Sequence, residues 1–171
     1  MKYTSTEANK LLKTIEARIE DLKNKEKKSS SFNAAYSEDP EKLRPEYDFH
    51  ETQAKINKLE ADVRTIKYAI HVFNVTHSLQ GFDGMTIDQA LVYLPQLSAR
   101  VRKLKDMAAA LPRERVEEPY YRSGVIDYVI ANYDIAEAEK TYLEEQEKLK
   151  NLQLALDAAN AGETMEIDIT L

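Results

Sequence analysis

Three histidines are the side chains in this 171-residue sequence best suited to bind a metal ion or act as a general base. His71 and His77 are six residues apart, about 600° around a helix, so they point to different faces. His50 is followed by Glu51 but has no second histidine four positions on, unlike the zinc motif His-Glu-x-x-His. We therefore expect no metal site and no cofactor.

The other residue types that commonly perform catalysis lack the necessary patterns. The sequence contains no cysteine, no Gly-x-Ser-x-Gly nucleophile motif and neither glycine-rich phosphate-binding motif. Carboxylates are numerous, but Glu144, Glu145 and Glu147 indicate a solvated helix face, and no Glu-x-x-His pair of a di-metal bundle is present. No catalytic residue is predicted.

Polar residues at predicted helix ends form the candidate ligand site. If the helices pack antiparallel, the end of the second helix, the start of the third and the start of the fourth gather at one end, with Arg122 in reach. Backbone amides at helix N-termini, together with an arginine, could hold a small anion. The alternative is that these residues only cap helices and fasten loops. The site would comprise Asn74, Thr76, His77, Thr86, Asp88, Arg122 and Tyr133.

Four stretches with apolar residues spaced three and four apart predict long helices at about 5–28, 48–78, 87–111 and 135–160. The second stretch keeps these spacings from Phe49 to His77, about four heptads, which is typical of a coiled coil. The third contains Pro95 without losing its register, so a kinked helix is expected.

Helix starts are marked by side chains that satisfy the first backbone amides. Thr4 with Glu7, and Thr86 with Gln89, have the spacing of a capping box. Asp134 precedes the fourth helix in the position of an N-cap. These pairs predict where three of the helices begin.

The remaining segments predict a loop and two strands. Residues 29–47 have no hydrophobic period and contain Pro40 and Pro45, which indicates a loop with one helical turn after Asp39. Residues 125–131 are β-branched and aromatic, and 165–171 alternate apolar with polar residues, so both are predicted strands. The two strands could form a βαβ crossover, or could pair with a second chain.

These elements together predict a mostly α fold: an elongated antiparallel four-helix bundle or coiled coil with two short C-terminal strands. Residues 1–171 are expected to form a single helical domain, because the length leaves little room for two independent cores.

Charge is unevenly distributed along the chain. The formal net charge is −6, which argues against broad binding to nucleic acid or anionic membranes. Residues 95–115 nevertheless carry a net charge of +4, and residues 134–171 carry −7. Neither a signal peptide nor a membrane span is expected, because no long apolar run occurs, and a cytoplasmic location is the default.

Several short segments resemble one protein family. They are Asn74-Val75-Thr76, the run from Gly84 to Leu91, Tyr121-Arg122-Ser123 with Ile126, and Tyr133-Asp134-Ile135. Their order is similar to that in the septicolysin-like family of small, uncharacterised bacterial helical proteins, and the resemblance spans about residues 48–160. It implies a helical, coiled-coil-like fold and offers no catalytic residues to carry over.

Three functional hypotheses follow from the sequence. The first is a non-enzymatic, self-associating structural or interaction protein, a homo-oligomer whose other protein partners are unknown. The second is a small-anion binder or an enzyme that uses the polar helix-end residues. The third is a nucleic-acid accessory protein that uses the basic third helix.

Overall fold

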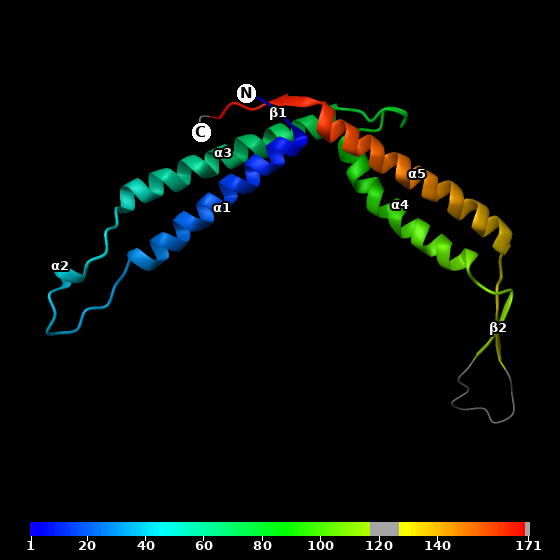
Figure 1. The fold of residues 1–171 in the computed structure, drawn as a ribbon, viewed down its shortest axis with the longest axis horizontal. Coiled ribbons are helices and arrows are strands. Elements are labelled where there is room, and N and C mark those ends of the chain that lie inside the picture. The colour runs from blue at the N-terminus through cyan, green and yellow to red at the C-terminus, as the bar shows by residue number, and fades with distance from the viewer. Residues whose placement is uncertain (117–126, 170–171) are drawn as a thin grey trace. The chain divides into compact units, whose positions relative to one another are not determined.

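A computed structural model describes residues 1–116 and 127–169 of the chain, and most of these residues are helical. Five helices and four short strands are present in the described residues (Figure 1). The chain, which the sequence predicts as a single domain, divides into two compact units. The first comprises residues 1–77 and 159–171, and the second comprises residues 78–158.

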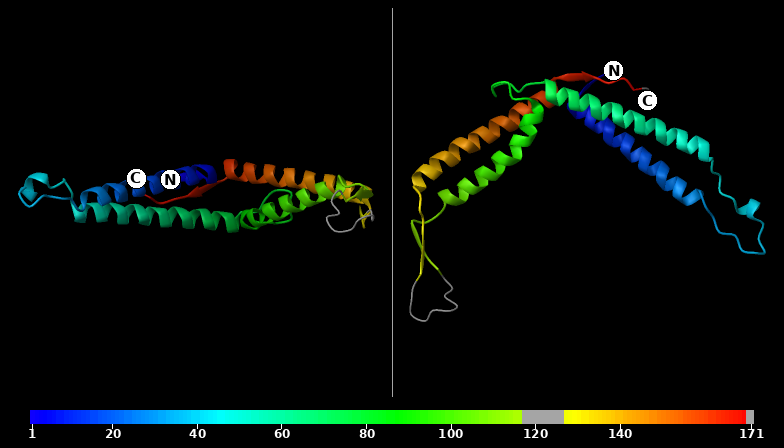
Figure 2. Two further views of the ribbon diagram at one scale, coloured as in Figure 1. Left: turned by 90° about the horizontal axis from the view of Figure 1, so that it is seen from below. Right: turned by 180° about the vertical axis from the view of Figure 1, so that it is seen from behind.

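The first unit is built on two antiparallel helices, α1 (Ser5–Ser29) and α3 (Phe49–Thr76), which lie side by side in Figures 1 and 2. Ion pairs Lys23–Glu60 and Glu16–Lys67, both 2.8 Å long, join the helices at two levels. The seam between them buries apolar side chains from both helices because each contributes one residue every three or four positions. The buried members are Ala8, Ile15, Ile19, Ile56, Ile66 and Phe73.

A two-stranded antiparallel sheet joins the start of the first unit to its last segment. Strand β1 (Lys2–Thr4) pairs with β4 (Thr164–Glu166), with Tyr3 opposite Met165. The hydrogen bonding continues beyond the strands, since the Met1 amino group donates to the Ile167 carbonyl and the Ile167 amide donates to the Met1 carbonyl. Met165, Ile167 and Ile169 are buried while Glu166 and Asp168 are exposed, so the predicted alternation is confirmed over these residues.

The connection between α1 and α3 contains one helical turn, α2 (Pro40–Leu43), which starts at the Asp39 cap as predicted. Its end is fastened back to α1. The Tyr47 hydroxyl donates to Glu26 Oε1 at 2.6 Å, and the Gln53 side-chain amide donates to the same oxygen at 2.8 Å. One carboxylate of α1 therefore fixes both the end of the connection and the first turns of α3.

The second unit is built on α4 (Ile87–Ala108) and α5 (Ile135–Gly162), which also lie side by side (Figures 1 and 2). Their buried residues are Ile87, Ala90 and Leu97 on α4, with Ala138, Leu152 and Leu156 on α5. Pro95 lies inside α4 and faces solvent, where a missing backbone donor is tolerated more easily than in the core. The capping boxes of α1 and α4, and the Asp134 cap before α5, are confirmed.

A compact turn of residues 78–86 leads into α4. The Leu79 side chain is buried, its amide donates to the Met85 carbonyl, and Ser78 bridges Thr86. Gly81 and Gly84 have φ values of 81° and 76°, which favour glycine over residues with a side chain. The two glycines therefore shape this turn.

A narrow β-ribbon joins α4 to α5. Strand β2 (Arg113–Arg115) pairs antiparallel with β3 (Tyr128–Ile130), and all six residues are exposed. Arg113 and Arg115 lie opposite Ile130 and Tyr128, and the Arg113 guanidinium stacks 3.5 Å from the centre of the Tyr128 ring. One face of the ribbon is therefore basic and aromatic.

Two predictions about the architecture need revision. The structure does not confirm a four-helix bundle or coiled coil, because the long helices pair two by two in separate units. The proposed βαβ crossover is wrong, since β3 pairs antiparallel with β2 and β4 pairs antiparallel with β1. Strands β1 and β2 were not predicted, because they are three residues each and too short to show a period.

No helix among the described residues is both long enough and apolar enough to cross a membrane.

The buried seam of the first unit can be tested at Ile66, whose side chain is fully inaccessible. Replacing it with alanine (Ile66→Ala) should lower the free energy of unfolding by about 2 to 5 kcal/mol, because the deletion leaves a cavity. Urea denaturation followed by circular dichroism measures this. Tyr68→Ala, at a residue of the same helix that is 70% exposed, should change stability by less than about 0.5 kcal/mol. Equal losses would place the seam elsewhere.

The contact between Tyr47 and Glu26 predicts a pH effect. The hydrogen bond to Glu26, with burial and the nearby negative charges, raises the pKa of Tyr47 from 10 to about 12. A raised folded-state pKa means that the bond stabilises the fold fully below pH 10 and that this contribution is lost between pH 10 and 12. Phenolate absorbance of the native protein minus that of Tyr47→Phe should titrate near pH 12, and Glu26→Gln should move it toward 10. A midpoint of 10 with Glu26 intact would contradict the contact.

Candidate functional site

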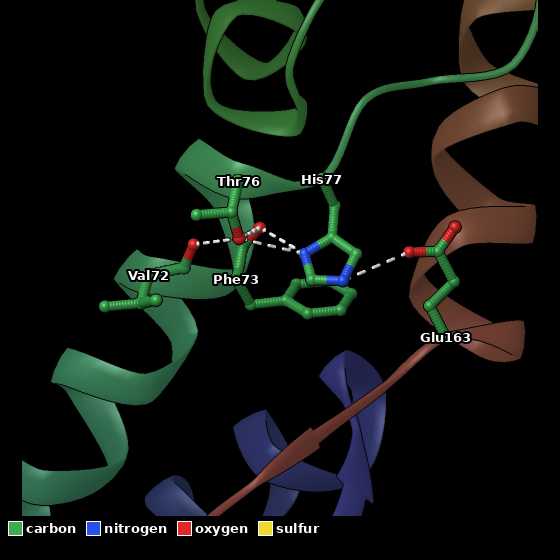
Figure 3. A network of polar contacts seen from close by, with 5 residues as sticks. All are labelled: Val72, Phe73, Thr76, His77 and Glu163. Atoms are coloured by element: carbon green, nitrogen blue, oxygen red, sulfur yellow. Dashed lines mark hydrogen bonds and ion pairs between the residues drawn. The ribbon is translucent and has the colours of Figure 1, made fainter.

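The end of α3 carries three of the predicted site residues, Asn74, Thr76 and His77, and Figure 3 shows the polar contacts there. The Thr76 hydroxyl donates to the Val72 carbonyl at 2.7 Å. His77 Nδ1 lies 2.9 Å from the Phe73 carbonyl and 3.1 Å from Thr76 Oγ1. Both side chains therefore satisfy groups in the last turn of their own helix.

The His77 ring is held on one face and at both ring nitrogens by residues of the same unit. It stacks on the Phe73 ring with centroids 4.1 Å apart, and Nε2 lies 3.5 Å from Glu163 Oε2. Because a carbonyl only accepts, the contact to Phe73 places the proton on Nδ1. Nε2 then donates to Glu163 only when the ring is protonated. The ring links α3 to the segment just after α5 (Figure 3).

The start of α4 carries the next two predicted residues. The Thr86 hydroxyl accepts a hydrogen bond from the Gln89 amide at 3.2 Å, and Gln89 Oε1 accepts from the Thr86 amide at 3.0 Å. Asp88, in the first turn, is exposed and already supplies the negative charge that a helix N-terminus favours. Two donors that an anion would need are thus occupied within the chain.

Tyr133 lies at the other end of α4. Its hydroxyl donates to the Met107 carbonyl at 3.0 Å, about 30 Å along the helix axis from Thr86. The reason is that the ribbon makes α4 and α5 antiparallel, so the start of α5 meets the end of α4. Tyr133 therefore does not join Thr86 and Asp88, and Arg122 lies outside the described residues.

The site residues at the end of α3 belong to the first unit, and those at the start of α4 belong to the second, so they form two groups. The side-chain groups that carry the prediction, Thr76, His77 and Thr86, bond to the helix ends they belong to. Within the described part of the chain, no three His, Asp or Glu residues come together in a way that could hold a metal ion. The chemistry of these groups is capping and fastening.

A wide depression of about 750 Å³ lies beside the turn of residues 78–86, on α5. Its lining includes Asp83, Glu144 and Glu147 against one cation, Lys148. The pKa of Lys148 is raised, chiefly by a hydrogen bond to Tyr93, so this ammonium already has a partner on α4. The excess of carboxylates disfavours a small anion here.

A groove between α1 and α3 was not anticipated from the sequence. It has a volume of about 580 Å³ and runs from Leu11 to Lys25 on α1, about 21 Å along the helix axis. Its floor consists of apolar side chains, and charged side chains of both signs line its edges. The floor residues are Leu11, Ile15, Leu22 and Leu59; the charged ones are Arg18, Asp21, Lys25, Lys55, Lys58 and Asp62.

The groove exists because a pair of helices has two open sides. The buried seam uses Ala8, Ile15 and Ile19, whereas Leu11 and Leu22 are only half-buried. Leu11 lies beside the apolar stripe of α1 and not within it. This extra apolar position next to the stripe was the feature of the sequence that could have indicated the groove. The lining has four cations and two anions, so the edges carry a net positive charge.

Charges on the second unit are partly neutralised between its own helices. Arg100 of α4 lies 3.8 Å from Glu145 of α5, so the basic segment of α4 and the acidic helix α5 meet in this ion pair. Glu145 Oε2 has no hydrogen-bond partner in the described residues, which makes this a loose ion pair rather than a hydrogen-bonded one. The basic side chains of the ribbon, Arg113 and Arg115, do not take part in this ion pair.

Comparisons with known proteins give a structural likeness. No protein-family model matches the chain, and no curated protein matches it. Its fold is similar to the crystal structure of a functionally unknown conserved protein from Corynebacterium diphtheriae, with a TM-score of 0.57. The match covers 97% of this chain and 100% of the other at 16% sequence identity, so it shows a shared fold alone.

The fastening role of His77 leads to a stability prediction. His77→Phe keeps a ring against Phe73 but removes the contacts to the Phe73 carbonyl and to Glu163, so it should cost about 0.5 to 1.5 kcal/mol of unfolding free energy. His71→Phe is the matched control, because His71 is exposed on the same helix, and it should change little. Chemical denaturation of both variants measures the difference, and equal effects would show that the His77 contacts contribute nothing.

Proposed function

We propose that this chain is a non-enzymatic, self-associating helical protein that acts as a structural or interaction module. The observation that carries the proposal is the open groove between α1 and α3, whose apolar floor includes Leu11, Leu22 and Leu59. Such a groove between two helices suits an added amphipathic helix. Association with another helix would remove this apolar surface from water.

The small core of each unit supports the same proposal. Two helices side by side bury one seam, so apolar residues on their other faces stay in solvent. On α5 these include Leu143 and Leu154, which are 55% and 57% exposed, and on α4 they include Leu91 and Val92 at 47% and 58%. Clusters of exposed apolar side chains are typical of interaction surfaces.

The alternatives have less support from the geometry. A small-anion binder or an enzyme would need free polar groups converging on a pocket, but Thr76, His77 and Thr86 bond to their own helix ends. A nucleic-acid accessory protein would use the basic segment, where Arg100 instead approaches Glu145 of α5. The chain as a whole has a net charge of −6, which disfavours broad binding to nucleic acid.

The proposal includes two expectations from the sequence. A relationship to the septicolysin-like proteins would agree with a helical chain that lacks catalytic motifs. A cytoplasmic location would agree with the absence of a membrane-spanning helix among the described residues.

Sedimentation equilibrium over a range of micromolar concentrations tests self-association. The average mass should exceed 19.6 kDa and rise with concentration, because association is governed by mass action. Leu59→Glu should bring the mass down toward the monomer, since it places a charge on the groove floor. A mass that stays at 19.6 kDa for the native chain throughout the range would disprove self-association.

A further inference from the structure

We propose that the occupant of the α1–α3 groove is helix α5 of a second copy of this chain, lying antiparallel to α1. This inference rests on the proposed self-association and names its surfaces. The outer face of α5, defined here as Leu143, Glu147, Lys150 and Leu154, is exposed along its whole length. These residues follow one another at intervals of four, three and four, so they form one stripe.

The spacing of apolar side chains is the same on the two surfaces. Leu143 and Leu154 are eleven residues apart, close to three helical turns, and so lie on one face about 16 Å apart. Leu11 and Leu22 in the groove are also eleven residues apart on one helix. A helix laid along α1 therefore brings both leucines of α5 over both leucines of the groove.

Charge selects the acidic helix as the partner and decides its direction. The groove has a net positive charge around Leu22, where Arg18, Lys25 and Lys58 outnumber Asp21. Helix α5 has a net negative charge around Leu143, where Glu139, Glu144 and Glu147 outnumber Lys140. Opposite potentials meet if Leu143 covers Leu22 and Leu154 covers Leu11. The helices then run antiparallel.

In this direction one charge pair falls in the middle of the contact. Glu147 is four residues after Leu143, and Arg18 is four residues before Leu22, so the two side chains lie at the same level. The opposite direction would place Lys150 at the level of Arg18 and set two cations together. The charge pair at the centre of the groove therefore favours the antiparallel direction.

A second copy is also the occupant that closes the assembly. Each chain carries both this groove and an α5, so copies of the chain can fill one another's grooves, and a two-fold dimer is the commonest closed form of such an assembly. The contact brings two units of different chains together and gives a reason for the acidic C-terminal third and the basic groove edges to occur in one sequence.

Disulfide trapping tests the contact directly, because the natural chain contains no cysteine. Leu22→Cys carrying one affinity tag is mixed with Leu143→Cys carrying another, and the mixture is oxidised mildly. A disulfide between differently tagged chains can form only between two copies. We expect this cross-link, and likewise Leu11→Cys with Leu154→Cys. Leu22→Cys with Leu154→Cys should give none, since those positions lie at opposite ends of an antiparallel contact.

Charge reversal provides a second test that leaves the core intact. Arg18→Glu should raise the dissociation constant of the dimer about tenfold. Adding Glu147→Arg in the same chain should restore most of the affinity. Arg64→Glu is the matched control, because Arg64 is exposed on α3 and lies about half a turn around the helix from Lys55. It should leave the affinity unchanged. Circular dichroism confirms that every variant folds.

The outcomes separate this inference from the proposed function. If the native chain self-associates but gives no Leu22–Leu143 cross-link, and Arg18→Glu has no more effect than Arg64→Glu, the groove is not the contact. Self-association then stands and the inference is overturned. If the native chain remains monomeric at all concentrations, both are overturned. Cross-linking in the stated pairs with rescue by Glu147→Arg supports both.

Discussion

A single pair of helices buries only a limited apolar surface, and this limit shapes both units of the protein. Two α-helices side by side meet along one seam, and here each seam takes a few aliphatic side chains and, in the first unit, Phe73. The faces turned away from the seam stay in water. Other contacts must therefore hold the ends of the helices, and apolar residues outside the seam remain available to a partner.

The ends of the elements are where the chain uses most of its specific polar contacts. The capping boxes at Thr4 and Thr86, the Tyr47–Glu26 hydrogen bond and the His77 ring each fix a helix end or a connection. The β1–β4 sheet adds buried Met165 and Ile167 to a unit whose helices alone form a thin core. Polar groups committed in this way are poor candidates for catalysis, because their donors and acceptors already have partners.

Charge and apolar surface are arranged on complementary elements. The groove on α1 and α3 is lined by more cations than anions. The exposed stripe of α5 begins among the glutamates Glu139, Glu144 and Glu147. Exposed ion pairs contribute little free energy, so charge would orient an association that apolar burial stabilises. Because Glu145 of α5 partly balances the basic residues of α4, that helix offers less positive charge to a nucleic acid.

The amino-acid sequence was sufficient to predict the long helices, three of their N-terminal caps and the alternation over residues 165–169, because these follow from spacings within a few residues of one another. The pairing of these elements could not be predicted in this way. The partners of the short strands, the division into two units and the position of Tyr133 at the far end of α4 depend on contacts between distant segments. The groove belongs to this second class: a stripe of apolar residues shows that a helix has a buried side, but which side chains remain uncovered depends on how many neighbours pack against it.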